Sequence, residues 1–420
     1  MTSDLCRPSV QAAGVGADGK GVEPSPPSTA VPARTSSRIP ALDGVRGIAA
    51  LIVVLQHSML ATSAALVASI GPDRDVHGTV TWLLTRTPLQ IVWAGHEAVL
   101  VFFVLSGLVL ALPHLGDRDR APSWPAYYGS RAVRLYLPVW GALVVAFVLS
   151  RATGWTHSGA GTSWLLDHGR LHTADSILGD ASLALPRQHP LIGALWSLRW
   201  EIAFSVLLPV YILVARTVRR AELIAVASVA MIGLSLGDGA GTYLPVFLLG
   251  VVVAREREAI TARIAPLGPA PLGGLLALIV VLITARAWGQ GLSFGLTTAM
   301  ATVGATLAVI LAMAHPAAQR LLTRRAVRWL GTRSFALYLV HEPIVTSLAY
   351  LLGRTPSMPL FLLVAVPAAL AGAELFFRGI ERPAHRLARH TGRAITARRG
   401  QTKAPSPTLA TPAEPARRAA

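Results

Sequence analysis

The sequence predicts an all-α fold: a polytopic membrane bundle of about ten transmembrane helices with both termini cytoplasmic. Hydrophobic residues make up 53% of the 420 residues and charged residues only 14%, and the mean hydropathy is +0.53. Soluble chains carry about a quarter charged residues. The apolar residues also gather in runs of about twenty, the length that crosses a bilayer core of about 30 Å.

Ten hydrophobic segments predict the ten spans, with ends defined to within a few residues. The segments are residues 43–65, 91–112, 132–153, 196–215, 221–237, 241–254, 271–288, 293–314, 333–352 and 359–378. The sixth segment is the shortest, and Gly and Pro flank it.

The basic residues predict the orientation of these spans. With both termini cytoplasmic, 29 of the 38 Lys and Arg residues fall in inner segments and 7 in outer loops. Cytoplasmic loops carry such an excess in membrane proteins. Residues 1–37 and 390–420 are rich in Pro and small or basic residues, so both are expected to be disordered tails. Residues 38–389 then form one membrane domain.

Charge and cysteine content exclude several classes of protein. The net charge of +17 arises from loops and the C-terminal tail rather than from a helix face interleaved with aromatic residues, so no nucleic-acid partner is expected. The single cysteine, Cys6, excludes a disulfide framework and a cysteine-based metal site. The chain has two Lys against 36 Arg and no Asn. That bias is typical of a GC-rich bacterial genome and indicates a bacterial plasma membrane.

The longest predicted outer loop, residues 154–195, contains His157, His168, His172 and His189. A metal site is one interpretation of these histidines, but their spacing matches no known ligand pattern. A solvated loop is the favoured interpretation, and no metal site is predicted.

The first span carries three polar residues on one face. Arg46 and His57 are eleven positions apart, which is three helical turns plus about 20° and about 16 Å along the axis. Asp43 lies within about 40° of His57 on the same face. Charged groups at membrane depth cost at least about 2.5 kcal/mol each on the insertion scale, which favours a functional role. The alternative is that His57 is a hydrogen-bonding residue packed between helices.

The fourth span contains Glu201 within WSLRWEIAFSVLLPVY, residues 196–211. Counted from the outer ends of their spans, Glu201 and His57 are expected at a similar depth. A carboxylate beside an imidazole fixes its tautomer and raises its basicity. The pattern favours a base that deprotonates a hydroxyl, because no motif for a nucleophilic serine accompanies it.

A second predicted cluster lies at the cytoplasmic mouth, where Arg46, Arg131 and Arg134 are expected to approach one another. Three guanidinium groups suit the oxygens of a phosphate. For Arg131 and Arg134, the excess of basic residues on the inner side is a sufficient alternative explanation.

Six motifs together resemble the acyltransferase family 3 of bacterial membrane acyltransferases, over about Arg38 to Arg389. They are LDGVRGIAALIVVLQH at 42–57, FFVLSGLVL at 102–110, RAVRLYLP at 131–138, WSLRWEIAFSVLLPV at 196–210, FALYLVHEPIV at 335–345 and IERP at 380–383. Each is a weak signal alone, but the order of the six matches that of the family.

The resemblance implies an O-acyltransferase that moves an acyl group other than an amino-acyl group, acetyl above all, from acyl-coenzyme A. The acyl-coenzyme A would be a co-substrate, with no permanently bound cofactor. The implied acceptor is a hydroxyl of a sugar, a glycolipid or a glycosylated metabolite. Membrane lipid would surround the bundle.

The resemblance also implies roles for individual residues. His57 would be the general base, with Arg46 supporting the site or the donor, and Arg131 and Arg134 would meet the coenzyme A phosphates. The reaction chamber would also involve Glu201, His341 and Ser106. Ser106 would donate to the thioester carbonyl, or it is a small residue that permits close helix packing.

Two positions depart from the family's pattern. Leu100 stands where many relatives have an acidic residue, so that role is absent or passes to Glu97. Glu342 follows His341 where an aromatic residue is common, and it is expected to influence His341 or the acceptor pocket. No hydrolase-like domain follows the bundle in this sequence, which favours a small or lipid-linked acceptor.

The main alternative function is a proton-coupled transporter or flippase for an acylated or charged solute. Transporters of this kind usually contain repeated halves with broken helices at matching places. The sequence contains no such internal repeat. A membrane scaffold is a third alternative, and it leaves the buried charges unexplained.

Overall fold

The computed structural model describes residues 39–70, 78–116, 123–170, 172–185 and 190–402. The predicted tail at residues 1–37 and the end of the C-terminal tail, residues 403–420, lie outside the described residues. Within the described ranges, every regular element is helical.

The elements are α1 (Pro40–Thr62), α2 (Ala64–Ile70), α3 (Thr79–Arg86), η1 (Pro88–Trp93), α4 (Gly95–Leu115), α5 (Trp124–Thr153), α6 (Ser163–His168), α7 (Ala174–Ser182), η3 (Gly193–Leu195), α8 (Trp196–Thr217), α9 (Ala221–Gly233), α10 (Ala240–Arg255), α11 (Arg257–Ile264), α12 (Pro269–Ile283), α13 (Ala285–Trp288), α14 (Phe294–Ala314), α15 (Pro316–Leu322), α16 (Arg325–Leu351), α17 (Met358–Phe376), η4 (Phe377–Glu381) and α18 (Arg382–Thr402).

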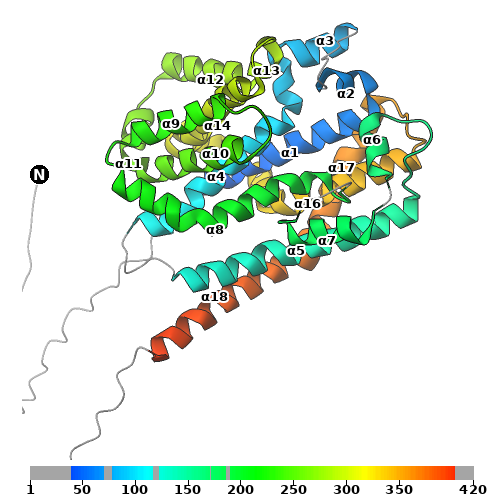
Figure 1. The fold of residues 1–420 in the computed structure, drawn as a ribbon. Coiled ribbons are helices and arrows are strands. Elements are labelled where there is room, and N and C mark those ends of the chain that lie inside the picture. Colours follow the sequence, from blue (N-terminus) through cyan, green and yellow to red (C-terminus); the bar gives the residue numbers. More distant parts are fainter. Residues whose placement is uncertain (1–38, 71–77, 117–122, 171, 186–189, 403–420) are drawn as a thin grey trace, which may run out of the picture. The chain divides into compact units, whose positions relative to one another are not determined.

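Each of the ten hydrophobic segments coincides with a helix (Figure 1). Among the described residues, six helices are long and apolar enough to cross a membrane: α1, α4, α5, α8 with η3, α14, and α17 continuing into α18. The helices α9, α10 and α12 are apolar but shorter. The structure therefore confirms an all-α bundle with membrane-length helices, while the count of ten spans stays a prediction.

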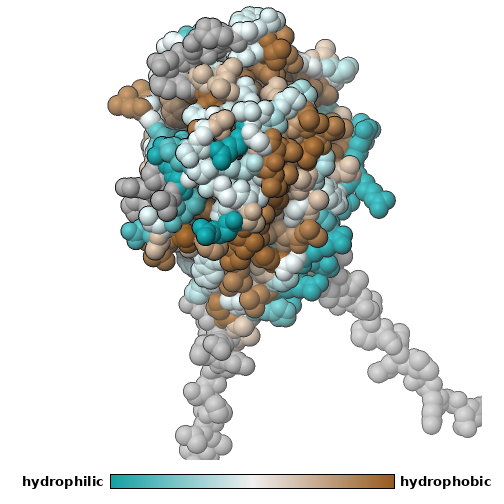
Figure 2. Space-filling model, turned by 90° about the vertical axis from the view of Figure 1, so that its right-hand side faces the viewer, coloured by the Kyte–Doolittle hydropathy of each residue, from teal (hydrophilic) through white to brown (hydrophobic). Residues whose placement is uncertain are grey.

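The surface of the bundle is rich in large apolar side chains. Figure 2 shows them as a broad brown band on one face. On α5, Val144, Phe147 and Val148 are exposed, and on α17 Leu363 and Leu375 are more than 70% exposed. Soluble proteins rarely expose contiguous apolar surface on this scale. The outer surface is suited to lipid.

Helix α1 lies inside the bundle and packs most extensively against α16 (Figure 1). The two backbones meet at glycines, because a Cβ on Gly47 would stand 2.6 Å from the nitrogen of Gly331. A Cβ on Gly331 would in turn stand 2.1 Å from the carbonyl oxygen of Asp43. Small residues permit this kind of close approach in membrane helices. The contact fixes the register between α1 and α16, and so places His57 opposite His341.

Helix α18 differs from the expected disordered tail, because it remains helical to Thr402. It runs along α5 (Figure 1). Ile395 of α18 fits over Gly129 of α5, where a Cβ would stand only 2.6 Å from its side chain. Arg382, Arg386, Arg389 and Arg393 are exposed, while Ala384 and Ala388 are buried. Packing of an apolar side on α5 therefore outweighs the basic composition that suggests disorder.

Candidate active site

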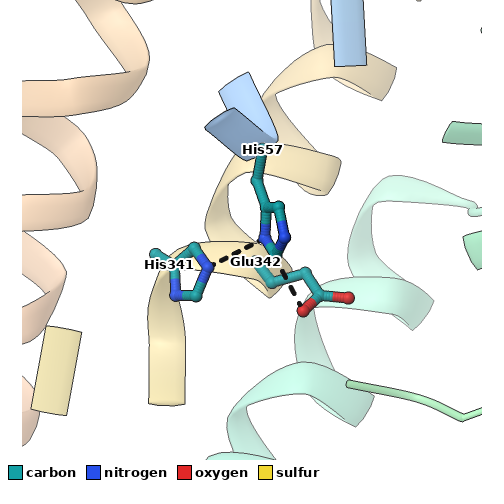
Figure 3. A group of neighbouring side chains, drawn as sticks. All are labelled: His57, His341 and Glu342. Carbon is teal, nitrogen blue, oxygen red and sulfur yellow. Dashed lines mark hydrogen bonds and ion pairs between the residues drawn. The ribbon is translucent and has the colours of Figure 1, made fainter. Parts of the chain in front are cut away.

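A compact group of polar side chains lies where the C-terminal part of α1 meets α16. It contains His57 of α1, His341 and Glu342 of α16, and His168 of α6, and is referred to below as the His57 cluster. In Figure 3, His57 points from α1 toward the two residues of α16. His341 and Glu342 are fully buried, and 16% of the His57 side chain is exposed.

Hydrogen bonds assign the proton positions on the two stacked histidines. The Nδ1 of His341 lies 3.0 Å from the carbonyl oxygen of Leu337, which can only accept, so this nitrogen carries the proton. A neutral imidazole has one N–H, so the Nε2 of His341 accepts from the Nδ1 of His57, 2.9 Å away. The Nε2 of His57 is then left with a free lone pair. This is the arrangement of a base with an orienting partner.

Glu342 anchors the cluster through three hydrogen bonds. Its carboxylate accepts from the backbone nitrogen of Gly193 at 2.7 Å and of Ala194 at 2.6 Å, and it also bonds the Nε2 of His168. Its Oε2 lies 3.9 Å from the Nδ1 of His57. The carboxylate thus ties α16, α6 and η3 together, and its charge lies where a protonated His57 would be stabilised.

His168 is the positive partner of this carboxylate. Its Nδ1 lies 2.7 Å from the carbonyl oxygen of Trp164, so this nitrogen also donates, and the ring is doubly protonated when its Nε2 bonds Glu342. Burial opposes the charged ring, but the hydrogen bond and the charge of Glu342 outweigh it and raise the pKa of His168 above 6.5.

An open pocket of about 370 Å³ adjoins the cluster and is lined by Asp167, His168, Arg170, Pro190 and Gly193. Two of these residues, His168 and Gly193, bond Glu342 directly. The ring of Trp164 lies 5.3 Å from that of His57 and covers one side of it. The cluster is therefore shielded from bulk solvent but has a pocket immediately beside it.

The same side chains could in principle bind a metal ion. Ligand atoms of His57, His341 and Glu342 lie within 4.8 Å of one another, and two histidines with a carboxylate are a common zinc set. In this structure, however, the two ring nitrogens that face one another share a hydrogen bond. The carboxylate oxygens also accept from three donors. The donor set is satisfied by the protein itself and fits a hydrogen-bond relay better than a metal site.

A second polar group, the Arg46 cluster, lies toward the N-terminal part of α1 and contains Arg46, Arg131, Arg134, Glu201, Ser106 and Glu381. At its centre, the Nη2 of Arg131 donates to Glu201 at 2.5 Å, and the hydroxyl of Ser106 donates to the same carboxylate oxygen at 3.2 Å. The Nε of Arg131 also donates to the Oγ of Ser205. Glu201 therefore neutralises Arg131 and holds Ser106.

The two other guanidinium groups of the cluster have no such partner. Among the described residues, neither Arg46 nor Arg134 forms a hydrogen bond, although both interact electrostatically with Glu201 and Glu381. Glu381 accepts from the backbone nitrogen of Ala336 at 2.9 Å. Three guanidinium groups thus face two carboxylates, and the excess positive charge is available to an anion.

The predicted pairing of Glu201 with His57 is wrong, since Glu201 bonds Arg131 and Ser106 while Glu342 lies against His57. The reason is the depth at which α8 begins. The residues before α8, Gly193 and Ala194, already lie at the level of the His57 cluster because they bond Glu342. Glu201, seven residues beyond Ala194, is therefore about 10 Å further along the helix axis.

His341 lies beside His57, at the place expected for a residue that contributes to the reaction chamber. The pairing of His168 with Glu342 was missed. The sequence contains two weak signals for it: the loop is rich in histidine, and Glu342 stands where an aromatic residue is common. Thr162 accepts from the backbone nitrogen of Leu165 and starts α6, but only the tertiary contact shows that this short helix turns His168 inward.

The structure thus contains a buried histidine pair beside a bound carboxylate, within an all-α bundle that has helices of membrane-spanning length. The chain belongs to the acyltransferase family 3, because the family's model, described as an acyltransferase domain, matches residues 39–378.

Among curated proteins, the chain is similar to the peptidoglycan O-acetyltransferase OatA of Listeria monocytogenes serovar 1/2a (strain ATCC BAA-679 / EGD-e). The two are 36% identical over 77 residues, which is 18% of this chain and 12% of that protein. No solved structure matches the chain.

Proposed function

We propose that this acyltransferase moves an acyl group, acetyl above all, from acyl-coenzyme A to a hydroxyl of a sugar-containing acceptor, with His57 as general base. The observation that carries the proposal is the relay from Leu337 through His341 to His57, which leaves the Nε2 of His57 free to accept a proton. Membership of the family supports acyl transfer, and the similarity to a peptidoglycan O-acetyltransferase supports a sugar acceptor.

In the proposed reaction, the Nε2 of His57 removes the proton of the acceptor hydroxyl as its oxygen attacks the thioester carbonyl carbon. The tetrahedral intermediate then collapses, the carbon–sulfur bond breaks, and His57 returns the proton to the departing thiolate. The hydrogen bond to His341 and the charge of Glu342, 3.9 Å away, stabilise the transient imidazolium. Proton transfer of this kind typically contributes 10²–10⁴-fold to a rate.

The Arg46 cluster is the proposed site for the phosphates of the donor. Within the part of the chain that the structure describes, Arg46 and Arg134 form no hydrogen bond, and guanidinium groups suit phosphate oxygens. Arg46 and His57 lie on one continuous helix, about 16 Å apart along its axis. A donor held by its phosphates at one end of α1 would extend its thioester arm toward the other end.

The proposed setting is a bacterial plasma membrane, crossed ten times with both termini cytoplasmic. The excess of basic residues in the inner segments supports this orientation. It puts the Arg46 cluster on the cytoplasmic side, where acyl-coenzyme A is available.

The test is transfer by the purified full-length protein in detergent, given labelled acetyl-coenzyme A and a panel of sugar hydroxyl acceptors. The proposal predicts labelled ester on an acceptor, free coenzyme A in equal amount, and no loss of rate with a metal chelator. Absence of both binding and turnover of acetyl-coenzyme A would contradict it. His57-dependent movement of a solute across vesicles, without ester formation, would instead support a transporter.

A further inference from the structure

A second pocket lies at the same end of α1 as His57 but on a neighbouring face. It has a volume of about 200 Å³ and is lined by Gln56, Ile70, Gln90, Trp93, Ala94, His96, Glu97 and Arg286. These residues come from α1, α2, η1, α4 and α13. It is referred to below as the Gln90 pocket. A volume of 200 Å³ holds about seven water molecules at ~30 Å³ each, or a ligand about the size of one sugar ring.

Three side chains that line this pocket have buried polar atoms without a hydrogen bond to any described residue: the Oε1 of Gln90, the Nε2 of His96 and the Nε of Arg286. Gln90 itself is only 8% exposed. A buried polar group without a hydrogen bond costs about 1–3 kcal/mol. Three such atoms around one cavity indicate a site whose hydrogen bonds are completed by something that enters it.

The unpaired atoms require a ligand that both donates and accepts. The Oε1 of Gln90 can only accept, and the Nε of Arg286 can only donate. The charge of Arg286 is also offset, since its Nε lies 3.7 Å from the carboxylate of Glu97, which is buried in the same wall. An anion would have no proton for Gln90 and would be repelled by Glu97. A hydroxyl donates and accepts at once, so neighbouring hydroxyls satisfy both kinds of atom.

We propose that the Gln90 pocket binds a neutral polyhydroxylated ring, with Gln90, His96 and Arg286 as its hydrogen-bonding groups. Apolar contact comes from Trp93, whose indole is held by a 2.8 Å hydrogen bond to the carbonyl of Leu84. Arg286 is held over the ring of Phe294 at 5.2 Å, so the polar groups are fixed in place before a ligand arrives.

The position of the pocket relates this site to catalysis. Gln56 and His57 are consecutive on α1, so they project about 100° apart at the same level. Gln56 lies against α4, where a Cβ on Gly95 would stand 2.0 Å from its Oε1, whereas His57 faces α16. A ring in the pocket thus occupies the face of α1 next to the base. Identifying this ring as part of the acceptor rests on the proposed function; its binding does not.

The proposal is tested by equilibrium binding of tritiated methyl glucoside to the purified full-length protein, with unlabelled inositol, acetate and inorganic phosphate as competitors. Methyl glucoside is expected to bind, inositol to compete, and the two anions to have no effect. Gln90→Leu is expected to weaken binding at least tenfold without lowering the thermal midpoint, because it removes a buried acceptor that has no hydrogen bond to any described residue. Ile70→Trp, at the 44% exposed rim of the pocket, is expected to block entry.

Two controls separate this proposal from its alternatives. Gln319→Leu, which removes an amide of α15 outside the pocket, is expected to leave binding unchanged. His57→Ala is expected to bind methyl glucoside as tightly as wild type does. If wild type binds methyl glucoside but transfers no acyl group, the proposed function is refuted while the proposed binding site stands. Binding of phosphate or acetate in place of the sugar would overturn the proposal. So would sugar binding that Gln90→Leu and Ile70→Trp leave unchanged, or no sugar binding at all.

Discussion

The two ends of α1 carry polar clusters that each contain an ion pair but differ in the groups around it. Each cluster contains a carboxylate that binds a cationic side chain: Glu342 with His168, and Glu201 with Arg131. In the His57 cluster, the group left free is a ring nitrogen that can take a proton. In the Arg46 cluster, the groups without a hydrogen bond to any described residue are the positively charged side chains of Arg46 and Arg134. The difference indicates that one end of α1 is suited to proton transfer and the other to holding an anion.

The largest effect is expected from His57→Ala. Loss of the proposed base lowers the rate of acetyl transfer by about 10³-fold, within the range for general bases, while binding of acetyl-coenzyme A stays within about threefold of wild type. The rate is measured as labelled ester formed from acetyl-coenzyme A. The matched control is His390→Ala, an exposed histidine of α18. Full activity of His57→Ala would end the base assignment.

Glu342→Gln is expected to lower kcat by about 10²-fold, comparable to removing one oriented electrostatic partner in other active sites. The amide keeps the size of the side chain but not the charge beside His57. Because the carboxylate acts through His57, the KM for acetyl-coenzyme A is expected to stay unchanged. Glu374→Gln, in a carboxylate bound by Arg333 and Arg378, is the control. A changed KM with a normal kcat would place Glu342 at the donor instead.

Arg46→Gln tests the other end of the comparison. It is expected to raise the KM for acetyl-coenzyme A about tenfold, with kcat within about twofold, because a charge-assisted hydrogen bond contributes about 1.5–3 kcal/mol. Initial rates over a range of donor concentrations give both constants. Arg378→Gln, in a 70% exposed side chain, is the control. A fall in kcat at unchanged KM would show that Arg46 belongs to the chemical step rather than to donor binding.

The smallest effect is expected in the pH dependence of stability. Because Glu342 raises the pKa of His168, their ion pair stabilises the fold fully below pH 6.5, the ordinary value, and is lost as the pH rises through the higher folded value. The thermal midpoint in detergent should therefore fall as the pH rises above 6.5, and His168→Gln should flatten that fall. If the thermal midpoint of His168→Gln fell with pH as much as that of wild type, other groups would be responsible for the fall. His157→Gln is the control.

The sequence was sufficient to predict the helices, because they depend on local periodicity. Arg46 and His57 lie on one uninterrupted helix as expected, and the structure has His341 beside His57. The contact between Glu342 and His168 is long-range, because the two residues are 174 positions apart in the sequence. No periodicity encodes such a contact.

The misplacement of Glu201 has a related cause. The predicted depth of Glu201 in the membrane depends on the ends of the hydrophobic segments, and so assumes that every loop lies outside the bundle. Instead, Gly193 and Ala194 enter it to bond Glu342. The prediction of a disordered tail from residue 390 also differs from the structure, in which α18 is helical to Thr402. Composition does not show that Ile395 fits over Gly129. In each case a tertiary contact outweighed the local pattern.

The most direct test of the central claim is the protonation state of His57. Nitrogen-15 NMR of histidine-labelled protein, with the His57 signals identified by their loss in His57→Ala, distinguishes the two ring nitrogens. The structure predicts a neutral ring at neutral pH, with the proton on Nδ1 and a free lone pair on Nε2. A proton on Nε2, or on both nitrogens, would contradict the account, because no base would then be available at the end of α1.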